Sequence, residues 1–103
     1  MTKRQITLSA RNSSELAELL DLDPVDALEL EFRSKLNLKL IQAVNKLGLT
    51  HAGAAIRVKS SRTRMTAILN GNTAGISTDR MLRMLYALGY KTKVTFLPSK
   101  LAA

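Results

Sequence analysis

The stretch from residue 49 to residue 71, LTHAGAAIRVKSSRTRMTAILNG, constrains the fold of this chain more than any other. Thr50 and the pair Ser60-Ser61 each precede a short run of residues with helical spacing, and a hydroxyl there can cap a helix by accepting from backbone N–H groups of its first turn. Gly71 follows the second run, where a left-handed residue usually ends a helix. The stretch therefore predicts two short helices joined by a tight turn.

The residue types within this stretch indicate how the two helices are used. Ala54, Ala55 and Val58 give the first helix a small inner face, which lets two crossing helices approach closely. The second helix turns outward a cationic and hydroxylic face made of Arg62, Thr63, Arg64, Thr66 and Ala67. Side chains of these types can read base edges in a major groove.

Residues from about 32 to 97 resemble the small Xre-type regulators of the phage-repressor (Xre/Cro) family, which include HigA-like antitoxins. The matching features are LT at 49–50, Ala54-Ala55, Ser61, an apolar residue at 65, ILNG at 68–71 and the later MLRMLYALGYKTKVTF. The resemblance implies that the first helix positions the second, whose N-terminal half contacts bases. With the flanking polar residues, the expected DNA-contacting set is Thr50, His51, Lys59, Ser61, Arg62, Thr63, Arg64, Thr66, Asn70 and Asn72.

Three positions depart from the family pattern. Lys59 stands where the turn usually has Gly, Ser60 where it has an apolar residue, and His51 where it has Gln. A non-Gly residue in a left-handed turn costs roughly 1 kcal/mol, which leaves open a rearranged turn. His51 has two readings, a surface or capping residue and a DNA contact. The altered turn also keeps open a rival function, a protein-interaction module that retains this shape without binding DNA.

Charge is divided unevenly along the chain, whose formal net charge is +8. Residues 1–31 contain three basic side chains and seven acids, whereas residues 32–103 contain thirteen basic side chains and a single acid, Asp79. A field of that sign attracts polyanions, so nucleic acid is the expected partner. RNA is less well supported than DNA, because the chain has only four aromatic side chains and no evident stacking platform.

The first part of the chain is predicted to be an addition to the helix-turn-helix domain. Residues 1–12 are either a frayed terminus or a short strand or arm, and SELAELLDL after them predicts a short acidic helix. That helix either covers the core or holds a basic partner, such as a toxin, or a second subunit. Asp23-Pro24 then opens a long helix that extends to about Leu47. We accordingly divide the chain into an arm with an acidic helix (1–28) and a DNA-binding domain (29–103).

After Gly71, a polar loop at 72–75 is placed to hydrogen-bond a phosphate, and Ser77 caps a helix that ends at Gly89. Its methionines and Tyr86 suit a core or a dimer seam. Residues 90–97, YKTKVTFL, alternate as in a strand, which could pair with residues 5–9 or with its own copy across a two-fold axis. The fold class expected is mainly α: a phage-repressor-like bundle of about five helices with a central helix-turn-helix and a short C-terminal β-strand.

Composition excludes several classes of function. The chain has no Cys and one His, which argues against a disulfide framework, a metal site or a cofactor. No nucleophile, base and acid are spaced for catalysis, so we expect no enzyme and no catalytic residues. The apolar runs are too short to cross a membrane and the start lacks a signal-peptide core, which favours the cytoplasm.

These observations predict a homodimeric, sequence-specific regulator of transcription that binds double-stranded DNA at an inverted-repeat operator. Arg62 and Arg64 are the candidates for guanine edges, Thr63 and Thr66 for smaller contacts, and Lys59, Asn70 and Asn72 for the DNA backbone. Two finer readings stay open: an autorepressing antitoxin of a type II toxin-antitoxin pair, and a phage or chromosomal repressor without a toxin.

Overall fold

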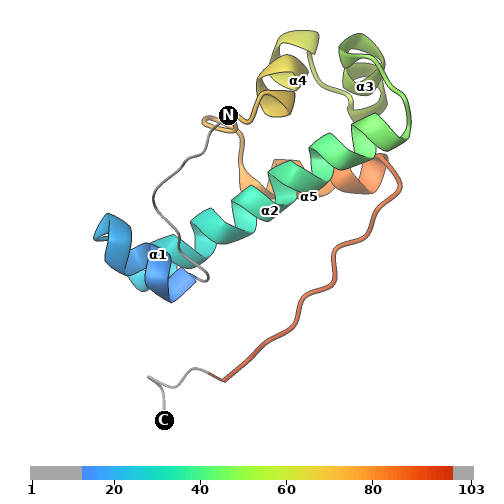
Figure 1. Cartoon of the computed structure of the whole chain (residues 1–103). Helices are drawn as coiled ribbons and strands as arrows, with labels where there is room; N and C mark the ends of the chain where they lie inside the picture. The colour runs from blue at the N-terminus through green and yellow to red at the C-terminus, as the bar shows by residue number, and fades with distance from the viewer. Residues whose placement is uncertain (1–12, 99–103) are drawn as a thin grey trace.

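The computed structural model describes residues 13–98 and places five helices among them (Figure 1). They are α1 (Ser13–Leu20), α2 (Pro24–Lys46), α3 (His51–Val58), α4 (Arg62–Leu69) and α5 (Thr78–Ala87). The mainly helical fold and the pair of short helices after Gly48 are confirmed. The predicted arm at residues 1–12 lies outside the described residues.

Helix α2 is the longest element; α1, α4 and α5 pack on it, whereas α3 packs on α4 and α5. Asp23 caps it, because its Oδ1 accepts from Val25 N at 2.8 Å, and Pro24 occupies the first helical position, where no backbone donor is needed. The chain leaves the helix through Gly48, whose φ is +67°. In its second half α2 buries Leu36, Leu40, Ala43 and Val44, spaced at three and four residues.

The hydrophobic core lies between the second half of α2 and helices α3, α4 and α5. Its largest fully buried side chains are Leu40, Met65, Ile68, Met81 and Met84. The flexible thioethers fill the irregular space where short helices cross. Ala54 and Ala55 are also buried, so α3 approaches its neighbours closely, as its small residues predicted.

Helix α1 lies apart from this core. It packs on the start of α2, at the far end of that helix from α3, and Ala17 and Ala27 are buried at this end of the molecule (Figure 1). The core cluster contains no residue before Leu36. Helix α1 therefore covers α2 rather than the central core.

The predicted C-terminal strand is wrong for this chain as the structure describes it. Residues 90–98 have no regular secondary structure and form an extended segment that, in the view of Figure 1, runs from the end of α5 below α2 toward the end that carries α1. Alternation of side chains suits a strand, but a strand also needs a neighbour to supply its ladder of backbone hydrogen bonds. No such neighbour lies among residues 13–98, and the suggested partner at residues 5–9 is outside the described part.

Candidate nucleic-acid interface

Two hydroxyl side chains set the starts of α3 and α4. Thr50 Oγ1 accepts from Gly53 N at 3.0 Å, and Ser61 Oγ accepts from Arg64 N at 3.0 Å. Both residues were predicted to contact DNA, and the structure places their hydroxyls as N-caps. A capping bond of this type stabilises a helix by about 1 kcal/mol.

The turn between the two helices keeps its form despite the lysine at its centre. Lys59 adopts φ 58° and ψ 51°, the left-handed conformation that glycine usually supplies. Its backbone N–H donates to Ile56 O at 3.2 Å, and Ser60 N donates to Ala55 O at 2.8 Å. These bonds satisfy carbonyls at the end of α3. The turn is therefore strained at Lys59 but not rearranged.

The outward face of α4 carries free cations. Arg62, Thr63 and Arg64 are exposed, while Met65 and Ile68 are buried beneath them. Within residues 13–98 neither arginine side chain has an acidic or hydrogen-bonding partner. Two guanidinium groups without partners can both be offered to acceptors on another molecule.

Beside this face, α4 and the loop that follows it enclose an open depression of about 370 Å³, called here the loop depression. It brings together four of the predicted residues, Ser61, Thr63, Arg64 and Asn72. Asn72 shapes the loop, since its N–H donates to Ala67 O at 2.8 Å and its Oδ1 accepts from Ala74 N at 3.2 Å. Exposed Asn70 ends α4.

His51 connects the first turn of α3 to α4. Its Nδ1 lies 2.9 Å from the Thr66 hydroxyl oxygen, and both residues are half-buried. This bond joins two predicted contact residues within the protein, so one ring nitrogen of His51 and the hydroxyl of Thr66 are already engaged. The pair fixes the angle between the helices of the motif.

Two further residues position this surface, and the sequence analysis missed both. Arg33 of α2 donates from Nη1 to Thr78 Oγ1 at 3.1 Å, and from Nη2 to the carbonyls of Thr73 (2.8 Å) and Ile76. One turn further along α2, Asn37 Nδ2 donates to Ile68 O at 2.9 Å, in the last turn of α4. The two side chains thus hold the end of α4 and the loop after it. Their only signal in the sequence is a polar pair four residues apart beside the apolar stripe of α2.

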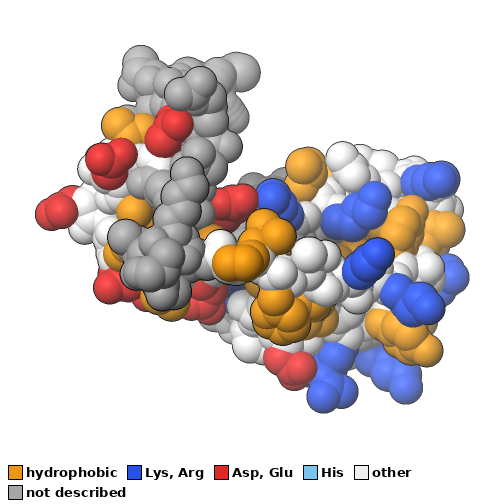
Figure 2. Space-filling model, turned by 90° about the horizontal axis from the view of Figure 1, so that it is seen from below, with side chains coloured by type: hydrophobic (Ala, Val, Ile, Leu, Met, Phe, Trp, Pro, Cys, Tyr) orange, Lys and Arg blue, Asp and Glu red, His pale blue; other side chains and the backbone are white. Residues whose placement is uncertain are grey.

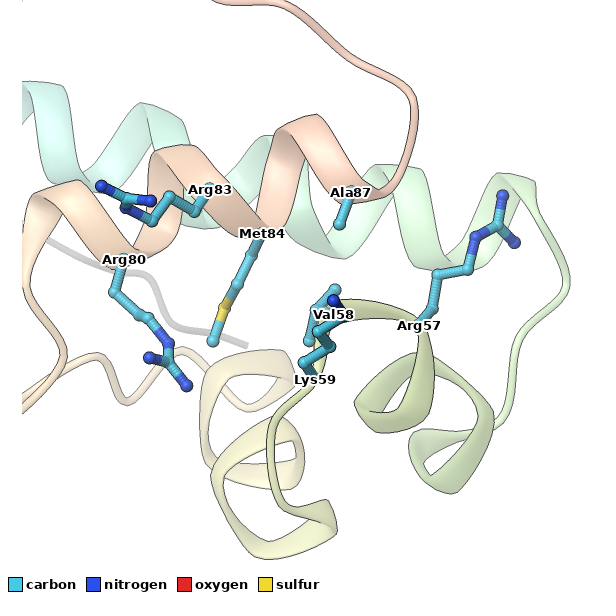
Figure 3. Close-up of a pocket in the computed structure, with 7 residues that line it drawn as sticks. All are labelled: Arg57, Val58, Lys59, Arg80, Arg83, Met84 and Ala87. Atoms are coloured by element: carbon cyan, nitrogen blue, oxygen red, sulfur yellow. The ribbon is translucent and has the colours of Figure 1, made fainter.

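Lys59 lies away from the loop depression, on a second hollow of about 290 Å³ between the turn and α5 (Figure 3). The rim of this turn hollow carries three further cations, Arg57, Arg80 and Arg83, and its other lining residues are Val58, Met84 and Ala87. In Figure 3 the Arg80 and Arg83 side chains lie at one side of the hollow and Arg57 lies at the other, with Lys59 between them. Arg83 Nε donates to Asp79 Oδ2 at 3.0 Å, which leaves three of the four cations without an acidic partner among the described residues.

The charge division seen in the sequence becomes a division in space. In the described chain, residues 13–31 hold seven acids and no base, and residues 32–98 hold twelve bases with one acid, Asp79. Figure 2 shows acidic side chains gathered at one end of the molecule and cationic ones at the other. The positive end carries the helix-turn-helix.

The described residues contain neither a metal-binding cluster nor a membrane-spanning helix. Residues 13–98 contain no group of three His, Cys, Asp or Glu side chains that could hold a metal ion. The same part of the chain has no helix of the length and apolar character needed to span a membrane.

A family model described as a helix-turn-helix domain matches residues 18–96, which include the last three residues of α1 and all of α2 to α5. No curated protein and no solved structure matches the chain.

Proposed function

The chain belongs to the helix-turn-helix domain family, and from this premise we propose that it is a sequence-specific, double-stranded DNA-binding regulator of transcription of the Xre type. One observation carries the proposal: α4 presents Arg62, Thr63 and Arg64 outward, and both guanidinium groups lack partners in the described chain. The positive half of the molecule attracts DNA phosphates whatever the base sequence of the DNA, and the two arginines can select particular bases.

In this mechanism α4 enters the major groove. Arg62 and Arg64 donate to guanine O6 and N7, and Thr63 makes a smaller base or phosphate contact. Asn72 in the loop depression and Asn70 at the end of α4 bind the phosphate backbone, as Lys59 does from the turn hollow. Thr50 and Ser61 act through the helix starts that they cap, whose N–H groups favour anions. His51 and Thr66 keep the two helices at the angle that docking requires.

The regulator acts in the cytoplasm as a homodimer on an inverted repeat. Two-fold symmetry matches half-sites about 34 Å apart, one helical turn of DNA, so that both copies of α4 reach the same side of the duplex. Bound over its own promoter, such a dimer is a repressor.

Fluorescence anisotropy on the duplex upstream of the gene, with random duplex as competitor and at two salt concentrations, tests the proposal. Arg62→Ala or Arg64→Ala should cost roughly 1–3 kcal/mol on the upstream duplex and much less on random DNA, because a base contact is lost. Lys35→Ala is the matched control, since Lys35 is an exposed cation of α2 paired with Glu31. Equal losses on both duplexes would reduce the arginine to a phosphate contact. Absence of binding at low salt would favour the protein-interaction module.

A second function is favoured by the acidic arm, defined as residues 13–31 of α1 and the first part of α2. It carries seven acids, and the large apolar side chains exposed on it are Leu19, Leu20, Val25, Leu28 and Leu30. Such a surface suits a basic protein with an apolar groove, which supports the reading of an autorepressing type II antitoxin whose partner is a toxic RNase.

Co-expression with the protein encoded by the adjacent gene tests the antitoxin reading. The combined variant Glu18→Lys, Asp26→Lys, Glu29→Lys should abolish the complex, because the charges that attract a basic partner are reversed. Asp79→Lys is the matched control, since Asp79 is the one acid of the described chain outside the arm. A complex that survives reversal of the arm, or no complex with the wild-type chain, would leave a regulator without a toxin.

A further inference from the structure

An apolar groove runs between α2, α5 and the extended C-terminal segment. The residues of α5 that line it are different from those that line the turn hollow. It has a volume of about 450 Å³, and its apolar lining comes from Phe32, Leu82, Tyr86, Tyr90 and Val94. Tyr86 is 71% exposed and Val94 63% exposed. We call it the aromatic groove, because three of the four aromatic side chains of the chain line it.

The fourth aromatic side chain lies on the segment that leaves the groove. Phe96 is 90% exposed and Leu97 beside it is 82% exposed, the two most exposed large apolar side chains of the described residues. Figure 1 shows this segment leaving the end of α5 and running, in that view, below α2 toward the end of the molecule that carries α1. The chain thus offers an apolar groove and an apolar segment, and does not place one in the other.

We propose that the aromatic groove receives Phe96 and Leu97 of a second copy of this chain. The proposal rests on the homodimer of the proposed function and names its surface. A two-fold interface needs one surface that complements itself, and a groove with a projecting apolar segment meets that requirement in both directions. Side-chain burial carries the association, with no strand pairing between the two segments.

Reach and the placement of the aromatic side chains support a second copy as the occupant. Residues 90–98 can extend about 30 Å at roughly 3.3 Å per residue, enough to leave one body and lie on another. Aromatic side chains are enriched at protein interfaces, and this chain has three of its four in the groove and the fourth, Phe96, on the projecting segment.

Directed cross-linking tests the exchange, since the chain has no cysteine of its own. A chain with Leu82→Cys is mixed with a longer, tagged chain with Phe96→Cys and oxidised. We expect a disulfide-linked dimer of the two unlike chains within minutes. Ile56→Cys replaces Leu82→Cys in the control, because Ile56 is 80% exposed on α3, outside the groove. Equal yields in the two mixtures, or a monomer closed by an internal disulfide when both cysteines are in one chain, would overturn the proposal.

Sedimentation equilibrium supplies the second measurement. Phe96→Ser should raise the dimer Kd at least tenfold, with an unchanged helical circular dichroism spectrum because Phe96 is not part of the core. Leu38→Ser, at a position 55% exposed on α2, should leave the Kd unchanged. A wild-type chain that stays monomeric, or a Kd that Phe96→Ser does not change, would contradict the proposal.

Measurements of DNA binding distinguish a failure of this interface from a failure of the proposed DNA-binding function. Phe96→Ser should bind a single half-site as the wild type does and lose the gain in affinity on a two-half-site duplex. Cross-linking without any DNA binding would contradict the proposed function and support the interface. Sequence-specific DNA binding without cross-linking would support the proposed function and contradict the interface.

Discussion

Three hydrogen bonds from Arg33 show how one residue can set the shape of a surface that it does not itself form. Its guanidinium reaches the Thr73 and Ile76 carbonyls and the Thr78 hydroxyl, over sequence separations of 40 to 45 residues. The bonds are partly buried and charge-assisted, the kind that contributes most to stability. The loop depression therefore depends on a side chain of α2.

Arg33→Met should lower the free energy of unfolding by about 2 kcal/mol, because it keeps the aliphatic stem and removes donors to two backbone carbonyls. Urea denaturation followed by circular dichroism measures the change. Lys35→Met is the control, since Lys35 is exposed and its pair with Glu31 is worth less than about 0.5 kcal/mol. Equal effects of the two substitutions would mean that the Arg33 bonds add nothing beyond a surface charge.

The left-handed Lys59 gives a second prediction at this scale. Lys59→Gly should stabilise the fold by about 1 kcal/mol, because glycine adopts φ 58° without the steric cost that a side chain incurs. Lys59→Ala retains the strain and should not stabilise. Both variants should reduce the salt slope of DNA binding by about 1 if the lysine neutralises a phosphate. A slope that neither variant alters would remove Lys59 from the interface.

At the scale of elements, the helix-turn-helix consists of two eight-residue helices. Isolated helices of that length are marginal, so their stability comes from packing and from polar contacts between them. Ala54, Ala55 and Met65 supply the packing, and the half-buried His51–Thr66 bond of 2.9 Å joins the two helices.

A double-mutant cycle on His51→Ala and Thr66→Val should give a coupling energy of about 1 kcal/mol, the usual value of a side-chain hydrogen bond. Unfolding of the four proteins in urea supplies the numbers. Thr63→Val in place of Thr66→Val is the control, because Thr63 lies on the same helix without a bond to His51. A coupling energy near zero would show that the two side chains act independently.

At the scale of the whole molecule, stability and charge are both divided along α2. Its second half lies in the core, while its first part, up to Glu31, carries α1 and the acids of the acidic arm. An element with few buried contacts opens more readily than the core does. The molecule thus combines a firmly packed positive end with a less firmly held negative end.

Amide hydrogen exchange should reveal this division. Amides of α1 should exchange at least tenfold faster than those around Leu40 and Val44, because opening α1 exposes little buried area. Leu40→Ala should destabilise the fold by about 2–5 kcal/mol and accelerate exchange at the core amides. Equal protection of the amides of α1 and α2 from exchange would show instead that the acidic arm and the core unfold together.

What the sequence by itself determined is the set of helices and where they begin. Asp23, Thr50, Ser61 and Ser77 each accept from a backbone N–H two or three residues ahead, so their effect is complete within one turn and can be read locally. Arg62, Thr63 and Arg64 could be assigned to the outer face of α4 for the same reason, because helical spacing alone separates them from Met65 and Ile68.

Only the tertiary structure decided which side chains hold those helices together. Asn37 meets Ile68 across 31 residues and Arg33 meets Thr78 across 45, and no spacing along the chain encodes a contact of that range. The prediction of a strand at residues 90–97 was wrong for a related reason. Its alternation is local, but the partner that would complete a ladder of hydrogen bonds is not, and the described chain does not supply one.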